Sequence, residues 1–248
     1  MTRAYCRMRL YDRHTWIPLL VLLSFSICAM LIPGIVPMAS WDSTFQFFDG
    51  HFTMFFSFFT VALVEIPLYF VFLLANQYFF FNTAVYVRFP DSRSYWGKRF
   101  LALAGDAAVY TLFLHLLLLS HFVFLGQTAL LPGKWKFLLI CFLVQSLSYC
   151  AFGALFAVLA FAFKSTTVSF FCIYGLVAVD YLASTGHWLS KFDGDSQPLF
   201  FLRAICLDPV HTGRYGSMAL LMAGLIVGLF LIASALFEDR DFLSKKVS

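Results

Sequence analysis

The sequence predicts an all-α integral membrane protein with six transmembrane helices and both termini in the cytoplasm. Composition is the first observation behind this prediction: 61% of the residues are apolar and 12% are charged. A soluble domain is about half apolar and about a quarter charged. A chain of 248 residues has too small an interior to hide this much apolar surface from water. Lipid is therefore its expected solvent.

The second observation is a set of long apolar segments. A bilayer core about 30 Å thick needs roughly 20 apolar residues in a helix that crosses it. Six segments meet this requirement: Trp16–Pro37, Phe52–Phe81, Phe100–Phe124, Lys136–Phe163, Thr166–Ser184 and Met218–Phe237. The second and fourth are longer than a perpendicular crossing needs, so we expect them to tilt or to project beyond the hydrocarbon. The whole chain, 1–248, is expected to form a single transmembrane domain.

The distribution of Lys and Arg is the third observation, and it predicts the orientation. Cytoplasmic connections of membrane proteins carry an excess of these residues, and six spans place both termini on the same side. Twelve of the 17 Lys and Arg residues fall in the two tails and in the second and fourth connections. This asymmetry predicts cytoplasmic termini. Because the cations gather on one side of a membrane, nucleic-acid binding is disfavoured.

Two segments outside the predicted spans have a composition that suggests structure. In residues 1–15 the arginines lie away from one arc of a helical wheel, which is formed by Met1, Ala4, Tyr5, Met8 and Tyr11. This pattern favours an interfacial helix on the inner leaflet, and a disordered basic anchor is the alternative. Residues 185–217 are rich in aromatic and aliphatic residues. They predict a re-entrant extracellular segment that dips into the outer leaflet or covers a central path.

Sequence motifs of catalysis and metal binding are missing. The chain has no GxxxxGK[ST] loop for ATP, no HExxH and no GxSxG. Its six cysteines have no CxxC spacing and its six histidines are scattered, so we expect neither a disulfide framework nor a metal site. We therefore expect a protein that is not an enzyme and that binds no cofactor directly.

Glu65 is the most unusual residue within a predicted span, and it precedes Pro67, which favours a kink. A charged carboxylate at the bilayer centre costs about 2.5–3.5 kcal/mol, so it is expected to face the bundle interior. His115, Gln145 and Ser148 are its candidate partners. One interpretation is a polar point on a translocation path, or a gate, formed by Glu65, His115 and Gln145. The other is a structural contact between helices.

Asp106 lies about two turns into the third predicted span from the cytoplasmic side. A salt bridge to an arginine at the inner leaflet, such as Arg13 or Arg88, explains this acid without a role in transport. We therefore expect a structural ion pair here.

The cytoplasmic segment Asn82–Phe100, reading NTAVYVRFPDSRSYWGKRF, lies between two long apolar runs. Pro90 disfavours a helical conformation of the residue before it. Asp91 or Ser92 can then cap a new, short helix. The segment is therefore predicted to contain a helix that is separate from the spans on both sides.

Aromatic and cationic residues share this predicted short helix. Tyr95 and Trp96 are expected to present large, rigid contact surfaces beside Arg93, Lys98 and Arg99. Aromatic residues next to arginine are typical of interface hot spots. The alternative is that the rings are ordinary interfacial anchors and that the cations only follow the positive-inside rule.

Two short runs of this sequence support a comparison with a known family. The run RFPDSRSYWGK at 88–98 and the run FEDRDFL at 237–243 are similar to segments of the permease subunits of ABC-2-type (type V) ABC transporters. In that family the first lies between the second and third spans, and the second follows the sixth. Six spans with both ends inside, a basic interfacial segment at the N-terminus and a long apolar outer connection also resemble this permease fold.

The resemblance implies that the 82–100 loop is a coupling loop, which docks in a groove of a separate cytoplasmic ATPase subunit. The coupling candidates are Arg88, Ser92, Arg93, Tyr95, Trp96 and Lys98. It further implies two copies of the ATPase, which hold ATP and Mg, and a second permease that is identical or homologous. The expected activity is export of a hydrophobic or amphiphilic substrate such as a peptide, lipid or drug. The chain also resembles small permeases of peptide-antibiotic export or immunity, which implies a multi-pass protein of the bacterial cell membrane.

A different class of function is the runner-up. The chain could be a six-span membrane module that binds the substrate for another multi-subunit transporter. Such a module needs a polar, substrate-shaped pocket within the spans. The sequence offers Glu65, His115, Gln145 and a few hydroxyl groups for it.

Overall fold

The structure, a computed structural model, describes residues 2–31, 44–82, 85, 88–185, 201–207 and 215–236. Within these residues all secondary structure is helical, which confirms the predicted all-α class. The main helices are α1 (Thr2–Tyr11), α2 (Arg13–Leu31), α3 (Thr44–Phe55), α5 (Ile66–Phe81), α7 (Ser92–Phe124), α8 (Leu131–Phe163), α9 (Thr166–Thr185) and α12 (Tyr215–Leu236). Shorter pieces are α4 (Phe58–Thr60), the π-helix η1 (Val61–Glu65), the 3₁₀-helix η2 (Thr128–Leu130) and α11 (Phe201–Ile205).

Four stretches of helix are long and apolar enough to cross a membrane: Phe48–Phe81, Ser92–Phe124, Thr128–Phe163 and Tyr215–Ala235. They match the second, third, fourth and sixth predicted spans and indicate a multi-pass membrane protein. Shorter apolar helices, Arg13–Ala29 and Thr166–Asp180, lie where the first and fifth spans are predicted. The count of six spans and the cytoplasmic position of the termini remain predictions.

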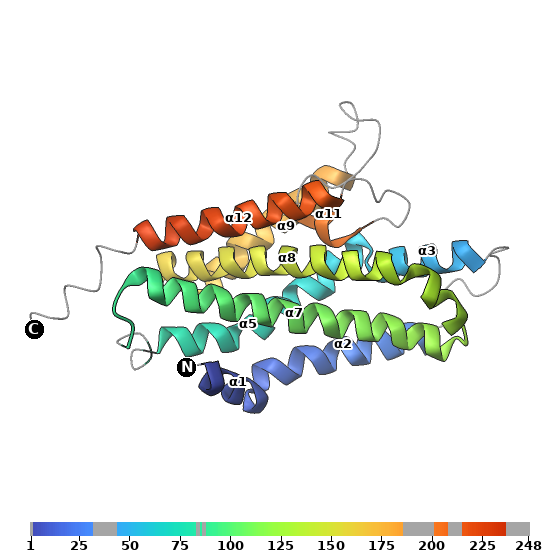
Figure 1. The fold of residues 1–248 in the computed structure, drawn as a ribbon, viewed down its shortest axis with the longest axis horizontal. Coiled ribbons are helices and arrows are strands. Elements are labelled where there is room, and N and C mark those ends of the chain that lie inside the picture. The colour runs from blue at the N-terminus through green and yellow to red at the C-terminus, as the bar shows by residue number, and fades with distance from the viewer. Residues whose placement is uncertain are drawn as a thin grey trace, which may run out of the picture.

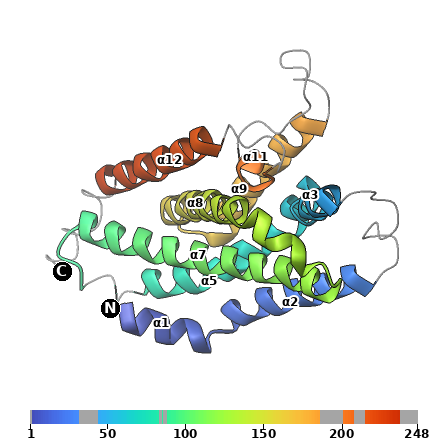
Figure 2. The ribbon, with the colours of Figure 1, turned by 45° about the vertical axis from the view of Figure 1, so that its right-hand side comes forward.

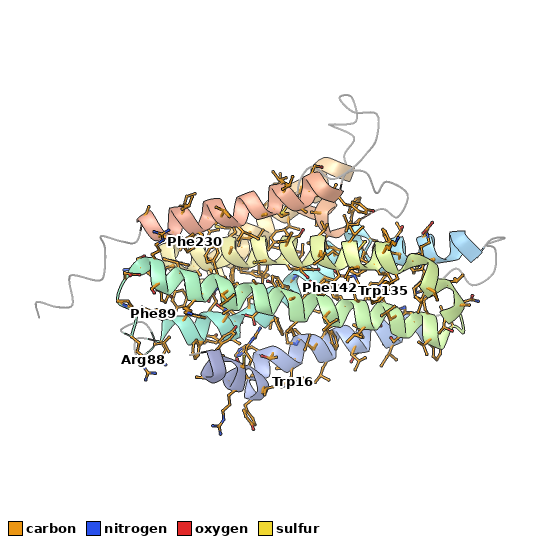
Figure 3. All side chains as sticks on the ribbon, viewed as in Figure 1. Trp16, Arg88, Phe89, Trp135, Phe142 and Phe230 are labelled. Carbon is orange, nitrogen blue, oxygen red and sulfur yellow. The ribbon has the colours of Figure 1, made fainter. Side chains whose placement is uncertain are left out.

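The long helices run back and forth along one axis of the molecule (Figure 1). α1, the last turn of α5, the first turn of α7 and the last turn of α12 all lie at the same end of the bundle, which we call the α1 end. Figure 3 shows Arg88 and Phe89 at this end and Trp135 toward the other. Under the predicted orientation, the α1 end is the cytoplasmic one.

Helix α8 lies in the middle of the bundle. It packs against α7, α9 and α12, and α12 covers the side of α8 that faces away from α1 and α2 (Figures 1 and 2). Small residues line the buried face of α8, including Ala151, Gly153, Ala154 and Ala157. Small side chains let membrane helices approach closely, and this explains how α5 and α7 come within contact of the α8 backbone.

Gly153 marks the closest of these approaches and supplies a test of the packing. A Cβ atom at this position would lie 2.9 Å from the Tyr69 hydroxyl and 3.3 Å from Leu73 Cδ1. We expect Gly153→Ala to lower the free energy of unfolding by about 1–3 kcal/mol, because overpacking a filled core forces its neighbours to move. The matched control is Gly175→Ala in α9, where a Cβ would meet nothing within 4 Å. Unfolding in detergent micelles measures both, and an equal effect of the two changes would contradict the close packing.

The second predicted span contains an irregular stretch before Pro67. Ser57 interrupts the helix and caps the next turn, and residues Val61–Glu65 then wind as a π-helix. Pro67 follows in α5 with no break in the helical backbone, so its missing N–H removes one backbone donor from this helical run. π-Helical turns inside α-helices occur frequently at functional sites, and here the turn ends on Glu65.

Helix α1 is held against α5 and α7 by a buried polar network. Arg9 forms an ion pair with Asp106, with an Nη2–Oδ1 distance of 2.9 Å. Its other terminal nitrogen donates to the Phe72 carbonyl and to the Thr15 hydroxyl. The expected structural ion pair of Asp106 is thus present, but its partner is Arg9 rather than Arg13 or Arg88. The buried face of α1 contains Tyr5 and Arg9.

This buried face differs from the apolar arc predicted for residues 1–15. Tyr11 belongs to that arc, yet 82% of its surface is exposed. Arg9 lies on the buried face because it forms an ion pair there with the buried Asp106 carboxylate. The predicted helical state of the segment is confirmed, and its interfacial position remains a prediction.

Helix α11 is the described part of the long connection before α12. Its residues Leu202, Ala204 and Ile205 are fully buried, and α8 and α9 are its main neighbours. The Leu202 amide donates to Asp180 Oδ2 at 3.1 Å. An apolar segment therefore enters the bundle here, and the rest of the predicted extracellular segment lies outside the described residues.

Candidate functional site

Glu65 lies at the end of the π-helix with 1% of its surface exposed, as the cost of an exposed carboxylate in lipid predicts. The Tyr149 hydroxyl donates to Glu65 Oε2 at 2.7 Å. The Tyr110 hydroxyl donates to the Glu65 carbonyl at 2.6 Å. The second carboxyl oxygen, Oε1, is buried and has no hydrogen-bond partner among the described residues.

The partners predicted for Glu65 bond elsewhere. His115 pairs through Nδ1 with the Thr111 carbonyl of its own helix at 3.0 Å. The Gln145 amide donates to the Ile205 carbonyl at 2.7 Å, which satisfies a carbonyl at the end of α11 that has no partner within that helix. The structure therefore does not bring Glu65, His115 and Gln145 together by hydrogen bonds, and their common role in a path or gate remains untested.

The third predicted partner, Ser148, donates to the Val144 carbonyl of its own helix at 2.8 Å. Tyr149 takes its place at Glu65. Tyr149 lies four residues after Gln145, so the two share a face of α8. The longer phenol side chain reaches the carboxylate while Gln145 bonds α11. The signal available in the sequence was this spacing of four residues.

A cavity of about 70 Å³ lies beside Glu65, where α2, α3 and α7 meet. Five polar side chains line it, and the other lining residues are apolar. His51 Nε2 and His121 Nδ1 are 3.0 Å apart, and His121 Nε2 is 2.6 Å from the Ser26 hydroxyl. The polar lining residues are Ser26, His51, Thr60, Glu65 and His121.

Neither His51 nor His121 was singled out from the sequence, because they are 70 residues apart and belong to different helices. Both are buried. Across the described residues, no group of three His, Cys, Asp or Glu side chains is arranged to hold a metal ion. What the cavity brings together is a carboxyl group and two imidazoles, which are groups that exchange protons.

The second candidate region is the start of α7. Asp91 caps the helix, as predicted, and its side chain accepts a hydrogen bond from the Ser94 amide. The prediction of a short, separate helix is wrong, because α7 continues without interruption from Ser92 to Phe124. No residue between Asp91 and the third predicted span breaks the helix, so the predicted short helix and the third span form one continuous helix.

Tyr95 and Trp96 are not exposed at this helix start, contrary to expectation. Each ring has 1% of its surface exposed. The Tyr95 hydroxyl donates to the Phe80 carbonyl at 3.2 Å, and the Trp96 ring lies 5.4 Å from the Phe161 ring. The first turn of α7 lies between α5 and α8, where burying large rings is favourable. A role for these rings in coupling remains untested, but in this structure they are not a contact surface.

Arg99 is a buried cation, whereas the sequence predicted it beside Tyr95 and Trp96 in an exposed contact surface or, as the alternative, assigned it to topology. It is fully buried, and it donates to the Tyr95 hydroxyl at 3.1 Å and to the Gln77 side-chain oxygen. Its guanidinium carbon lies 4.9 Å from the Phe81 ring centre and 5.0 Å from that of Trp96. No carboxylate pairs with Arg99 within the part of the chain that the structure describes. Aromatic faces stabilise it instead.

The remaining coupling candidates divide by exposure. Ser92 is buried, whereas Arg88, Arg93 and Lys98 are exposed at the α1 end. We call these three residues the cationic surface. The buried residues Tyr95, Trp96 and Arg99 belong to the same first turns of α7, and Figure 3 shows Arg88 at the α1 end.

Comparisons with known proteins found no match to a family model, to a curated protein or to a solved structure.

Proposed function

We propose that the chain is the membrane-spanning permease subunit of an ABC transporter, which exports a hydrophobic or amphiphilic substrate with energy from a separate ATPase. The cationic surface carries this proposal. Arg93 and Lys98 project from the first two turns of a helix of 33 residues. Because α7 is continuous, a partner that moves this surface moves a helix long enough to cross the bilayer.

The packing beneath the cationic surface supports the same proposal. Tyr95, Trp96 and Arg99 tie the first turns of α7 to α5 and α8. A movement of the exposed cations is therefore transmitted to α5 and α8 through these buried contacts. The proposed partners are two cytoplasmic ATPase subunits, which bind ATP and Mg, and a second permease that is identical or homologous.

An apolar groove supports the proposed substrate class. It has a volume of about 440 Å³ and lies between α1, α2, α5 and α7. Trp16, Leu101 and Val109 are exposed along it, and Lys98 lies at its edge. Its volume is in the range of small-molecule sites, and its lining suits an amphiphile with an acidic head and an apolar body. The entry of α11 into the bundle also agrees with the re-entrant segment of the proposed fold.

Charge reversal of the cationic surface tests the docking of the ATPase. We expect Arg93→Glu together with Lys98→Glu to lower the amount of copurifying ATPase at least about tenfold, because like charges across an interface cost several kcal/mol. The complex is purified from native membranes in mild detergent, and ATP turnover is then measured. Lys136→Glu is the control, since this exposed cation lies near the start of α8. An unchanged complex with unchanged turnover in the double variant would contradict the proposal.

The second candidate function is the six-span module that binds substrate for another transporter. The cavity with Glu65 and the two histidines favours it, because a binding module needs polar groups within the spans. However, 70 Å³ is well below the roughly 300–1,000 Å³ of small-molecule sites. Purification separates the two functions, since only the permease is expected to bring a soluble ATPase with it.

A further inference from the structure

The cavity beside Glu65 contains a group of three titratable side chains, and the proposed coupling to an ATPase does not use it. Glu65, His51 and His121 are all buried, and they come from three separate elements of the fold. The remaining walls are apolar, among them Leu22, Phe55 and Leu117. Burying three titratable groups in such surroundings is costly. Intramembrane ionisable groups of this kind usually mark a functional site.

The charge balance of the cavity favours one bound proton. None of the described Lys or Arg residues lines it, so an ionised Glu65 with two neutral imidazoles leaves one uncompensated negative charge. With two protons bound, the group would be positive. With one proton the group is neutral overall, either as a carboxylic acid or as a carboxylate next to an imidazolium. In a medium of low dielectric constant, the neutral states are strongly preferred.

Among the residues that the structure describes, no other titratable group supplies a compensating charge. The groups that face Glu65 from neighbouring elements are Tyr110, Tyr149 and Cys206, which are ordinarily neutral near pH 7. His115 bonds the carbonyl of Thr111. The nearby charged side chains bond elsewhere: Asp49 pairs with Lys134, Asp106 with Arg9, and Asp180 accepts from Leu202.

The lining of the cavity offers more than one place for the proton. Glu65 Oε1 has no partner among the described residues. In the same lining, His51, His121 and Ser26 form a continuous hydrogen-bonded chain. A volume of about 70 Å³ is enough for a small number of water molecules, which occupy roughly 30 Å³ each in the liquid. A water with polar partners on both sides can carry a proton between them.

We propose that this cavity is a proton-binding site, in which Glu65, His51 and His121 together hold one exchangeable proton. In the exchange, the O–H bond of the Glu65 carboxylic acid breaks and an N–H bond forms on the histidine pair. The products are a carboxylate and an imidazolium, and no electrons are transferred. Glu65 is also the last residue of the π-helix Val61–Glu65. The inference does not depend on the proposed ABC permease function.

Nuclear magnetic resonance of the labelled carboxyl carbons tests the site directly, because the chain has only two glutamates, Glu65 and Glu238. The full-length protein is labelled with ¹³C at the glutamate side-chain carboxyl, reconstituted in lipid nanodiscs and titrated between about pH 5 and about pH 9. Glu238→Gln assigns the two signals. We expect Glu65 to show the shift of a carboxylic acid near pH 6, and to change together with ¹⁵N signals of histidine as a coupled titration. A Glu65 signal that stays ionised while the signals of both histidines stay neutral over the whole range would overturn the proposal.

Variants of the histidine pair test whether the proton is shared. Without the imidazoles an ionised Glu65 has no cation beside it. In the double variant His51→Phe with His121→Phe, the carboxylic-acid signal of Glu65 should therefore persist to a pH about one unit or more higher than in the wild type. His115→Phe is the matched control, because this buried histidine does not line the cavity. Ser26→Ala, which removes only the hydroxyl bonded to His121, is the milder variant. It should alter the histidine signals and the Glu65 titration together. If Glu65 titrates identically in wild type and in these cavity variants, the group does not share a proton and the inference is wrong.

Discussion

Replacing Asp106 with Ala is expected to lower the free energy of unfolding by about 3–5 kcal/mol, because it leaves the buried Arg9 without its counter-charge. Arg9 contacts Asp106 Oδ1 through Nη2 at 2.9 Å and through Nε at 3.1 Å. The other carboxyl oxygen accepts hydrogen bonds from Tyr5 and from Asn76. One substitution therefore removes a partner from three buried side chains. Reversible unfolding in detergent micelles measures the loss.

A double variant separates the unpaired charge from the lost contacts. Replacing Arg9 by Met and Asp106 by Leu removes both charges and keeps much of the side-chain volume. Replacing a buried ion pair by apolar residues is often neutral or stabilising, so we expect the double variant to recover most of the stability. A single variant within about 1 kcal/mol of wild type would show that Arg9 finds another partner, and would contradict the importance of this pair for α1.

Trp96→Ala is expected to cost about 3–5 kcal/mol of folding free energy, the usual loss for a large aromatic residue in a core. Its ring is 1% exposed. The neighbouring rings of Tyr95, Phe100 and Phe161 lie 5.4–6.0 Å from it, centre to centre. Deletion leaves a cavity among rigid rings that relax only partly. Thermal unfolding of the purified protein measures this effect.

The same substitution discriminates between the two interpretations of Trp96. A ring that docks on a partner would leave the isolated chain stable when it is removed and would weaken only the complex. Lys98→Ala, two residues further along α7, is the control for stability alone, because an exposed residue of this kind usually changes stability by less than about 0.5 kcal/mol. A stable Trp96→Ala chain that has lost its ATPase would restore the interpretation of an exposed docking ring.

The candidate sites could be predicted only where a feature depends on residues that are close together in the sequence. The Asp91 cap depends on a few consecutive residues, and Pro90 before it allowed the start of the helix to be predicted. The burial of Glu65 follows from the cost of a carboxylate in lipid. Its partner could not be predicted in the same way, because α8 is apolar around most of its circumference. The spacing of four residues places Gln145 and Tyr149 on one face of α8, but a helix that is apolar on most sides does not show which neighbour that face meets.

The prediction that Tyr95 and Trp96 are exposed was wrong for a related reason. Aromatic residues between cations look alike whether they face a partner or the inside of their own bundle. The length of α7 decided between these cases, since its first turns are packed between α5 and α8. Residues far apart in sequence, such as His51 and His121, carry no mutual signal at all until the helices that hold them are placed together.

The helical class, four of the long apolar helices and the need to bury Glu65 and to pair Asp106 could all be predicted from the order of residues. These properties depend on the transfer of side chains and backbone groups between water and lipid, which is nearly additive along the chain. The pairing of Arg9 with Asp106, the bond between Tyr149 and Glu65, and the cavity that Glu65 shares with two histidines became apparent once the helices were packed together. These choices depend on the rotation and axial offset of each helix against its neighbours. Both are set by the packing of the whole bundle.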